Sequence, residues 1–162
     1  MLILDCDIAS TLAKVDKIDL LSKVFSHSKI YITISVYTEL IRAKRAGFSF
    51  PDKIFTNIPV ITMNSDELNF FQKFSKYNYI HFGEAEGVSI CKNRGAIFLT
   101  NDSQVVKFCM KNNIKVLNLK DFLVLVAIKK IITYSEMNDL IRQIEEKDNT
   151  FIRNKADIID EY

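Results

Sequence analysis

Short apolar stretches alternate along the chain with longer segments in which apolar residues recur every three or four positions. The short stretches are rich in β-branched side chains, which favours strands, and the longer segments have the spacing of one helical face. Five strands are predicted on this basis, at residues 1–4, 29–33, 58–63, 96–100 and 114–119. The third is expected at a sheet edge, because Pro59 cannot donate a backbone hydrogen bond.

Helices are predicted between these strands. Residues 9–25 are expected to form two short helices, and further helices are expected at 35–46, from 65, 83–93, from 102 and from 121. Ser35 and Ser135 are predicted N-caps, and Gly47 and Gly95 are predicted helix ends. Strands that alternate with helices favour a parallel sheet covered on both faces. The fold class is therefore α/β: a single α/β/α layered domain with a central, mostly parallel twisted sheet and a helical C-terminal extension.

Composition agrees with one globular domain. Hydrophobic residues make up 48% of the 162 positions and charged residues 26%, with only four Gly and two Pro. Residues 1–147 are assigned to the domain. Residues 148–162 are polar with scattered Ile, and we expect a loosely held tail or a segment ordered by a partner. The net charge of +2 is too small to indicate a nucleic-acid partner by itself.

The three cysteines, Cys6, Cys91 and Cys109, are odd in number and far apart. They fit neither a disulfide framework nor a paired-cysteine zinc site, and we interpret them as reduced, buried thiols of a cytoplasmic protein. The longest apolar stretch, residues 122–132, is interrupted by two lysines and is too short to span a bilayer, so no membrane partner is expected. A helix there that is apolar all round would be buried or form half of an interface, so a homodimer is a hypothesis.

Carboxylates collect where predicted strands end or the next helices begin: Asp5, Asp7, Glu39, Glu84, Glu86 and Asp102. Taken singly, each has an ordinary explanation. Asp102 is well placed to be an N-cap, and Glu86 lies in an early helical turn, where acids favour the helix dipole. Together at one edge of a parallel sheet, these acids would repel one another unless a cation neutralised them. Oxygen ligands without a nearby Cys or His pair suit Mg²⁺ or Mn²⁺ and argue against zinc.

The order and placement of four short pieces resemble the PIN-domain nucleases over nearly the whole chain. The pieces are Leu4-Asp5-Cys6-Asp7, Tyr37-Thr38-Glu39-Leu40, Gly83-Glu84-Ala85-Glu86 and Leu99-Thr100-Asn101-Asp102. The resemblance implies a metal-dependent ribonuclease that hydrolyses phosphodiester bonds of single-stranded RNA, often the VapC-like toxin of a toxin–antitoxin pair. It therefore also implies a small antitoxin protein as a partner. The Gly-Glu-Ala-Glu piece resembles a less studied branch of the family.

Carried over by position, the resemblance implies that Asp5, Glu39, Glu84 and Asp102 are the catalytic residues and metal ligands. Thr100 would support Asp102 through a hydroxyl hydrogen bond. Asp7 stands where Asn or Ser is usual, and Glu84 stands where Asp is usual. Residues two apart on a helix point to different sides, so Glu84 is preferred to Glu86 as the ligand. The supporting candidates are Asp7, Glu86, Thr100 and Asn101.

Other polar residues are assigned lesser roles. His81 is interpreted as a surface-loop residue rather than a general acid. The basic clusters at 42–45 and 92–94 fall at predicted helix C-termini, where cations complement the dipole, and so at the edge opposite the acids. Lys14 and Lys17 are the better candidates for phosphate contacts.

Two alternatives remain open. A haloacid-dehalogenase-type phosphatase also begins with a strand that ends in Asp-x-Asp, but Ala9 stands where its Thr is expected and no convincing lysine motif is present. The other alternative is a PIN-like module that has lost activity and binds RNA or protein. The presence of all four expected acids weighs against this loss.

Overall fold

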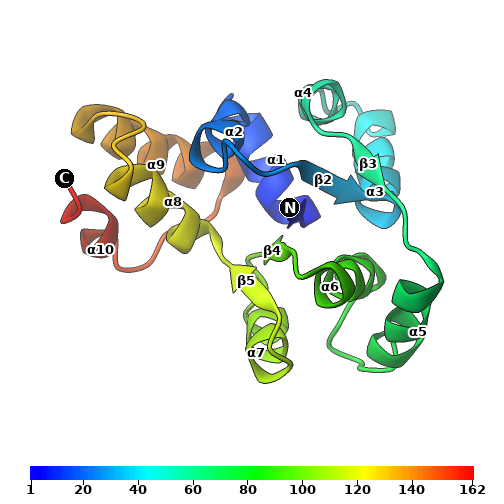
Figure 1. The fold of residues 1–162 in the computed structure, drawn as a ribbon. Helices are drawn as coiled ribbons and strands as arrows, with labels where there is room; N and C mark the ends of the chain where they lie inside the picture. The colour runs from blue at the N-terminus through cyan, green and yellow to red at the C-terminus, as the bar shows by residue number, and fades with distance from the viewer.

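The computed structural model of residues 1–162 contains a five-stranded, fully parallel sheet in the order β3-β2-β1-β4-β5. The strands are β1 (Leu2–Leu4), β2 (Ile30–Thr33), β3 (Val60–Ile61), β4 (Ile97–Leu99) and β5 (Lys115–Leu117). The sheet runs through the middle of the molecule with helices on both sides (Figure 1). The predicted fold class, the five strands and the edge position of the third strand are confirmed.

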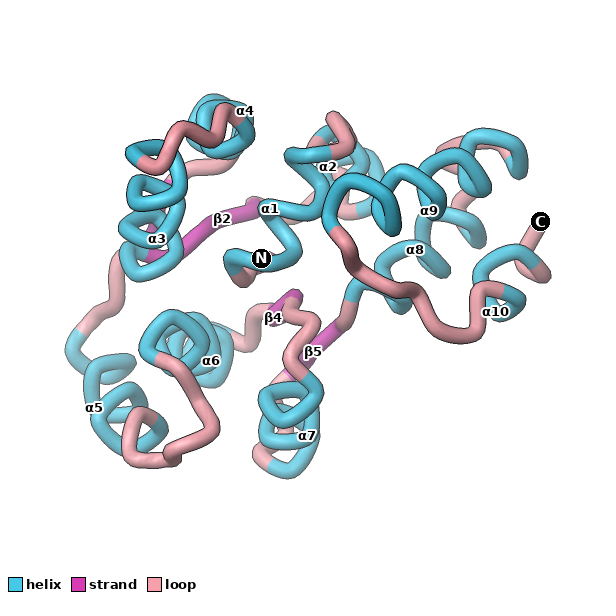
Figure 2. Tube along the Cα trace, turned by 180° about the vertical axis from the view of Figure 1, so that it is seen from behind, coloured by secondary structure: helices cyan, strands magenta, loops and turns pink.

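Ten helices surround the sheet. The view from behind shows short strands in the middle of the molecule with helices on both sides (Figure 2). The helices are α1 (Cys6–Lys14), α2 (Asp19–Val24), α3 (Ile34–Arg45), α4 (Phe50–Asn57), α5 (Ser65–Phe74), α6 (Phe82–Arg94), α7 (Ser103–Lys111), α8 (Leu119–Ile128), α9 (Tyr134–Asp148) and α10 (Ala156–Ile159). None of them combines the length and the hydropathy that a bilayer-spanning helix needs.

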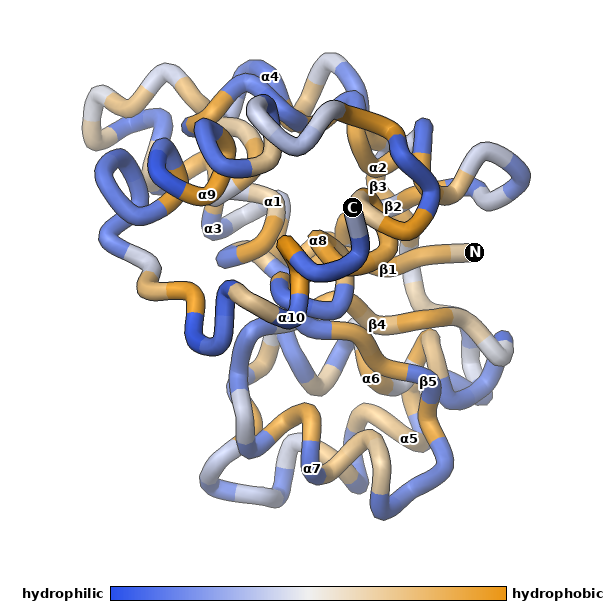
Figure 3. The backbone as a smooth tube through the Cα atoms, turned by 90° about the vertical axis from the view of Figure 1, so that its left-hand side faces the viewer, coloured by the Kyte–Doolittle hydropathy of each residue, from blue (hydrophilic) through white to orange (hydrophobic).

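Alternate side chains of β1 enter two separate hydrophobic cores. Leu2 and Leu4 belong to a core of 27 buried residues shared with α1, α2, α8 and α9. Ile3 points to the opposite face and joins a smaller core of 13 buried residues with α6 and α7. This separation results from the two-residue side-chain period of a strand. Hydropathy along the chain shows the same layering, with apolar strands at the centre and mixed helices outside (Figure 3).

Two predicted N-caps are wrong by two residues. Thr33, not Ser35, caps α3, and its hydroxyl accepts a hydrogen bond from the N–H of Val36. Thr133, not Ser135, caps α9 in a reciprocal box with Glu136. In both cases a threonine at the end of the preceding segment already has the extended backbone that an N-cap requires.

The helix α4 is absent from the sequence prediction, in which the helix ending at Gly47 is followed directly by the strand at 58–63. Pro51 lies in the first turn of α4, where the missing N–H has no intrahelical partner to lose. The helix then buries Ile54 in the larger core.

The C-terminal segment is not the loosely held tail that was expected. Ile152 and Ile158 are buried in the larger core, and α10 packs against α8 and α9. The hydroxyl of Tyr162 donates a hydrogen bond of 3.0 Å to the backbone carbonyl of Ile132. Apolar side chains scattered through a polar segment, Ile152 and Ile158 above all, thus hold it on the domain.

This packing also changes the interpretation of α8. Phe122, Leu123, Val126 and Ala127 are fully buried within the chain, between the sheet, α2 and α10. The apolar character of α8 is thus explained by intramolecular burial. The homodimer stays a prediction without the support that this helix was expected to give.

Candidate active site

The polarity of the sheet brings several acids to its carboxyl edge. The chain runs outward in opposite directions from β1 and β4, so the crevice between their carboxyl ends is the topological switch point of the sheet. Leu4 pairs in register with Leu99, so Asp5 and Thr100, the next residue after each strand, are neighbours. This is the place where open parallel sheets gather their functional groups.

Asp5 is held firmly by its surroundings. It is the N-cap of α1, and its Oδ1 accepts a 2.8 Å hydrogen bond from the N–H of Cys6. Its Oδ2 accepts a 2.6 Å hydrogen bond from the hydroxyl of Thr100. The residue is only 8% exposed. Both oxygens are therefore oriented by donors on two different elements.

Burial and nearby charge alter the chemistry of Asp5. Burial, with a smaller contribution from the negative charges of Asp7 and Glu39, raises the pKa of Asp5 to about 6, although the donors Thr100 and Cys6 oppose this rise. Glu39 and Asp7 are both exposed. The carboxylates of α1 and α3 are thus near enough to Asp5 to oppose its ionisation.

Glu84 approaches the same crevice from α6. The residue lies at the third position of the helix, and its Oε2 accepts a 2.7 Å hydrogen bond from the N–H of His81, the N-cap. Burial raises the pKa of Glu84 to about 7, and the charges of Asp5 and Asp102 add to this effect. Glu84 therefore lies within electrostatic range of both Asp102, which comes after β4, and Asp5, which comes after β1.

Glu86, two positions further along α6, faces elsewhere, as its spacing predicted. Its Oε2 accepts a 2.8 Å hydrogen bond from the N–H of Ser35 in the first turn of α3. The side chain is buried, so this bond ties α6 to α3 and satisfies a helix N-terminal donor. Reaching back to the cap of α6 is the role of Glu84, not of Glu86.

Asp102 caps α7, the ordinary role for an acid at this position, and its Oδ1 accepts hydrogen bonds from the N–H groups of Gln104 and Val105. The expected hydroxyl bond from Thr100 to the Asp102 carboxylate is not formed. Thr100 donates to Asp5 instead, and accepts a 3.2 Å hydrogen bond from the backbone N–H of Asp102. Asn101 turns away, and its Oδ1 accepts a long hydrogen bond from the N–H of Leu119.

Lys14 is not free to serve as a phosphate contact. It lies in the last turn of α1 and forms a 2.5 Å ion pair with Asp148 at the end of α9. Of the basic clusters, Arg42, Lys44 and Arg45 lie in the last turn of α3, and Lys92 and Arg94 in that of α6. These clusters therefore lie away from the carboxyl edge, as predicted.

The donor set fits a hard divalent cation in its chemistry. Two of its carboxylates, Asp5 and Glu84, have pKa values raised by burial and, to a smaller extent, by neighbouring negative charge, a cost that a bound cation would remove. No three His, Cys, Asp or Glu side chains lie together so that they could hold a metal ion. The chemical fit therefore concerns the ligand type, since Mg²⁺ keeps several waters and usually takes one or two carboxylates together with substrate phosphates.

A family model described as DUF3368, a PIN domain, matches residues 1–158. The chain belongs to the PIN-domain family. The haloacid-dehalogenase alternative was based on the Asp-x-Asp motif at the end of the first strand. The PIN assignment accounts for Asp5 and Asp7 equally well, so this motif no longer favours the alternative. No curated protein matches the chain.

Among solved structures, this PIN domain is similar to a chain of the VapBC-1 structure from nontypeable Haemophilus influenzae. The two share 13% sequence identity and align with a TM-score of 0.55, over 72% of this chain and 96% of that one. At this identity the likeness concerns the fold. The α/β architecture is thus shared with a protein of otherwise distant sequence.

Two features of the site are not visible in any single motif. The bond between Glu86 and the N–H of Ser35 joins residues 51 positions apart, and only the predicted proximity of two helix starts at one edge hints at it. The other is the approach of the C-terminal segment to the residues after β4. Its signal is the pair of isoleucines, Ile152 and Ile158, in otherwise polar sequence.

Proposed function

We propose that this PIN domain is a metal-dependent ribonuclease that hydrolyses phosphodiester bonds of single-stranded RNA. The observation that carries the proposal is a pair of buried acids, Asp5 and Glu84, whose pKa values are raised by burial and further by nearby acids: Asp7 and Glu39 for Asp5, and Asp5 and Asp102 for Glu84. Buried acids with raised pKa values in a crevice are typical of catalytic sites. Family membership adds to this support.

In the proposed site, Asp5, Glu39, Glu84 and Asp102 would hold Mg²⁺ or Mn²⁺. Such an ion supplies Lewis-acid activation of water and neutralises charge on the phosphate during in-line displacement. Asp5 contributes a carboxylate fixed by two donors, so its orientation does not have to be reached during the reaction. Thr100 is a positioning residue because it acts through Asp5. The expected products are a 5′-phosphate and a 3′-hydroxyl.

Each remaining polar group has a structural part in this proposal. Glu86 keeps the N-terminal ends of α3 and α6 together, which supports the proposal that Glu39 and Glu84 serve the same site. Asp102 keeps its side chain oriented by capping α7. Asp7, exposed beside Asp5, adds negative charge that would favour cation binding.

We also infer that the ribonuclease acts as the toxin of a toxin–antitoxin pair in the cytoplasm, with a small antitoxin protein as its partner. The similarity of the fold to a chain of the VapBC-1 structure supports this inference. Co-expression with the product of the adjacent reading frame tests it. Growth arrest by the chain alone, relieved by co-expression, is the expected result.

The enzymatic proposal is tested by incubating purified protein with varied single-stranded RNAs and Mn²⁺. We expect cleavage by the wild type and loss of at least about a hundredfold in Asp5→Asn, the size of effect that a lost charge-stabilising group has at active sites. Asp139→Asn, an exposed acid on α9, is the matched control and should cleave normally.

Calorimetric titration with Mn²⁺ separates this proposal from the inactive RNA- or protein-binding module. A catalytic site should bind Mn²⁺ and lose that binding in Asp5→Asn. RNAs left intact by protein that carries Mn²⁺ would favour the module.

A further inference from the structure

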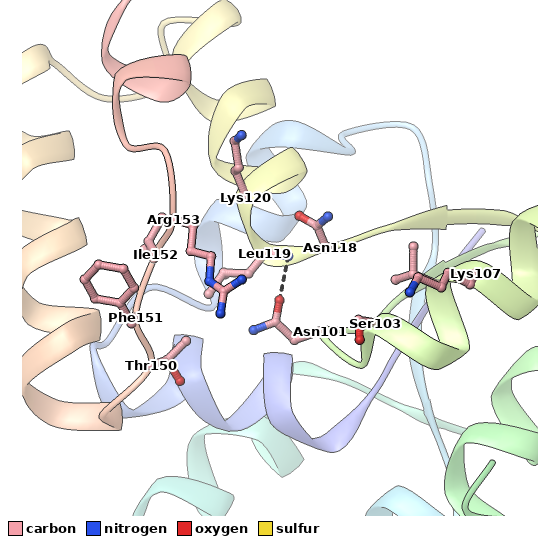
Figure 4. A pocket seen from close by; sticks show the side chains of 11 residues that line it. Asn101, Ser103, Lys107, Asn118, Leu119, Lys120, Thr150, Phe151, Ile152 and Arg153 are labelled. Atoms are coloured by element: carbon pink, nitrogen blue, oxygen red, sulfur yellow. Dashed lines mark hydrogen bonds between the residues drawn. The ribbon is translucent and has the colours of Figure 1, made fainter. Parts of the chain in front are cut away.

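A cavity of about 440 Å³ opens beside the candidate active site. One wall comes from the residues after β4 and β5 and from α7, including Asn101, Ser103 and Lys107. The other wall comes from the C-terminal segment between α9 and α10, including Thr150, Phe151 and Arg153 (Figure 4). Asn101 precedes Asp102 in the chain and both follow β4, so the cavity lies at the same edge of the sheet as the candidate active site, although none of the site's acids lines it.

The charge of this cavity is opposite to that of the crevice. Its lining contains Lys107, Lys120 and Arg153 and not a single acid. Lys120 is paired with Asp157, but Lys107 and Arg153 form no ion pair. Both are exposed, so their charged groups can reach a ligand without displacing a protein partner.

The helix starts beside the cavity are already capped. At the start of α7, the N–H groups of Gln104 and Val105 donate to the Asp102 carboxylate. At the start of α8, the N–H of Asp121 donates to the side chain of Asn118. The attraction for a phosphate group therefore comes from the two free cations, Lys107 and Arg153, on opposite walls of a cavity that no acid lines.

We propose that this cavity binds a backbone phosphate of the RNA strand next to the bond that is cleaved. The strand then runs from the cations of the cavity, past Asp102, to the carboxylates around Asp5. The ring of Phe151 is 75% exposed at the rim, with Nζ of Lys155 over one face at 5.5 Å from the ring centre. This inference rests on the proposed ribonuclease function and assigns the C-terminal segment a part in holding the substrate.

The test measures binding of a fluorescein-labelled, short single-stranded RNA by anisotropy, with EDTA present so that no cleavage occurs. The double variant Lys107→Ala/Arg153→Ala should weaken binding about tenfold or more. Its salt dependence should fall by about 0.7 in the log–log slope, the contribution of one phosphate contact with a single strand. An unchanged affinity would overturn the proposal.

The matched control is the double variant Arg45→Ala/Lys115→Ala, which removes the same charge at exposed positions away from the carboxyl edge. Its affinity should change less than about twofold, since distant exposed charges are screened by salt. An equal loss in both double variants would mean that net charge alone attracts RNA, and would refute the assigned site.

Two further arms distinguish the sources of phosphate and the two proposals. Adenosine 5′-monophosphate should bind much more weakly than the oligonucleotide, and equal affinity would indicate a site for a free nucleotide and overturn the strand assignment. If the wild type cuts RNA but Lys107→Ala/Arg153→Ala binds RNA as tightly as the wild type, this inference fails and the ribonuclease proposal stands. If the double variant loses binding but the wild type never cuts RNA, the ribonuclease fails and the RNA site stands.

Discussion

The hydroxyl of Thr100 donates a 2.6 Å hydrogen bond to Oδ2 of Asp5 across two adjacent strands, although the two residues are 95 positions apart in the chain. Thr100 is fully buried, so no water can replace this donor. The bond favours the charged form of Asp5 and works against the burial that raises the pKa of this carboxyl to about 6.

Removing this donor should therefore suppress activity most strongly at low pH. In Thr100→Val the pKa of Asp5 should rise further, by about one to two units, because a hydrogen bond to a charged group contributes about 1.5–3 kcal/mol. The rising limb of the pH–rate profile for RNA cleavage should move to higher pH. Thr100→Ser, which keeps the hydroxyl, should restore the wild-type profile. Coincident profiles for the wild type and Thr100→Val would contradict the role of Thr100.

The raised pKa of Asp5 also predicts how stability varies with pH in metal-free protein. The folded state binds this proton more tightly than the unfolded chain, so the contribution of Asp5 is most favourable at low pH. It is lost as the pH rises between about 4 and 7, by about 3 kcal/mol in total.

Asp5→Asn should remove this loss of stability at higher pH. At pH 8, with EDTA, the variant should unfold several degrees higher than the wild type, and the difference should shrink towards pH 4. Paired acids such as Asp148 have lowered pKa values and give the opposite pH dependence, so the difference between the two proteins is the quantity to measure. Asp139→Asn, which breaks an exposed ion pair, should differ from the wild type by less than about 1 kcal/mol, without the change between pH 4 and 7. A gap that stays constant across this range would show that Asp5 is not the cause.

A second buried carboxylate, that of Glu67, is stabilised by an ion pair. Glu67 has no exposed side-chain surface, and both of its oxygens accept from the guanidinium of Arg94, at 2.5 and 2.7 Å. Although burial opposes it, this pairing, with bonds from the backbone of Asn64 and the side chain of Asn93, holds the pKa of Glu67 below its usual range.

Arg94→Ala should therefore destabilise the protein by about 3–5 kcal/mol at pH 7 in urea unfolding, because it leaves a buried charge unpaired. The stabilisation by the pair is present above the ordinary pKa of Glu and is lost as the pH falls below about 4, so the gap to the wild type should narrow in acid. Arg142→Ala, which breaks an exposed pair, should cost less than about 1 kcal/mol. If Arg94→Ala proves as mild as this control, the pairing of Glu67 does not have the assigned role.

Close contact between α6 and β4 predicts the effect of enlarging Gly87. A Cβ at this position would lie 2.4 Å from Cε2 of the Phe98 ring, so the helix would have to move away from the sheet. Gly87→Ala should lower the free energy of unfolding by about 1–3 kcal/mol, even though Ala is the better helix former.

Gly83→Ala is the comparison, since its added Cβ would meet only Ser35 Cβ at an ordinary 3.7 Å. Thermal unfolding should place this variant close to the wild type. The pair Gly87→Ala/Phe98→Leu should recover part of the loss, and no recovery would show that the ring is not the obstacle.

Much of this fold can be predicted from the local pattern of apolar and polar residues. The apolar stretches predict all five strands, and acids placed after strand ends lead to the crevice around Asp5 and Glu84. The helix α4 is missed when Pro51 is taken as a barrier rather than as a first-turn residue. The N-caps are displaced by two residues because Thr and Ser are nearly equivalent as caps, and only the backbone conformation at Thr33 distinguishes them.

Long-range contacts set the limit of prediction from one sequence. The donation from Thr100 to Asp5 rather than to Asp102 depends on the pairing of β1 with β4 in register. The docking of Ile158 depends on a space between α8 and α9 that no local pattern describes. The basic cavity beside Asn101 cannot be predicted from local pattern, because one wall follows β4 and β5 and the other lies between α9 and α10.

The brevity of the outermost strands has a consequence for recognition. β3 has two residues and comes directly after Pro59, and β5 at the other margin has three, so neither margin offers a long row of vacant amide and carbonyl groups. An extended peptide that docks by lengthening a sheet would gain few main-chain bonds here. A protein inhibitor of this domain must instead bind through side chains that pack against helices or enter surface cavities.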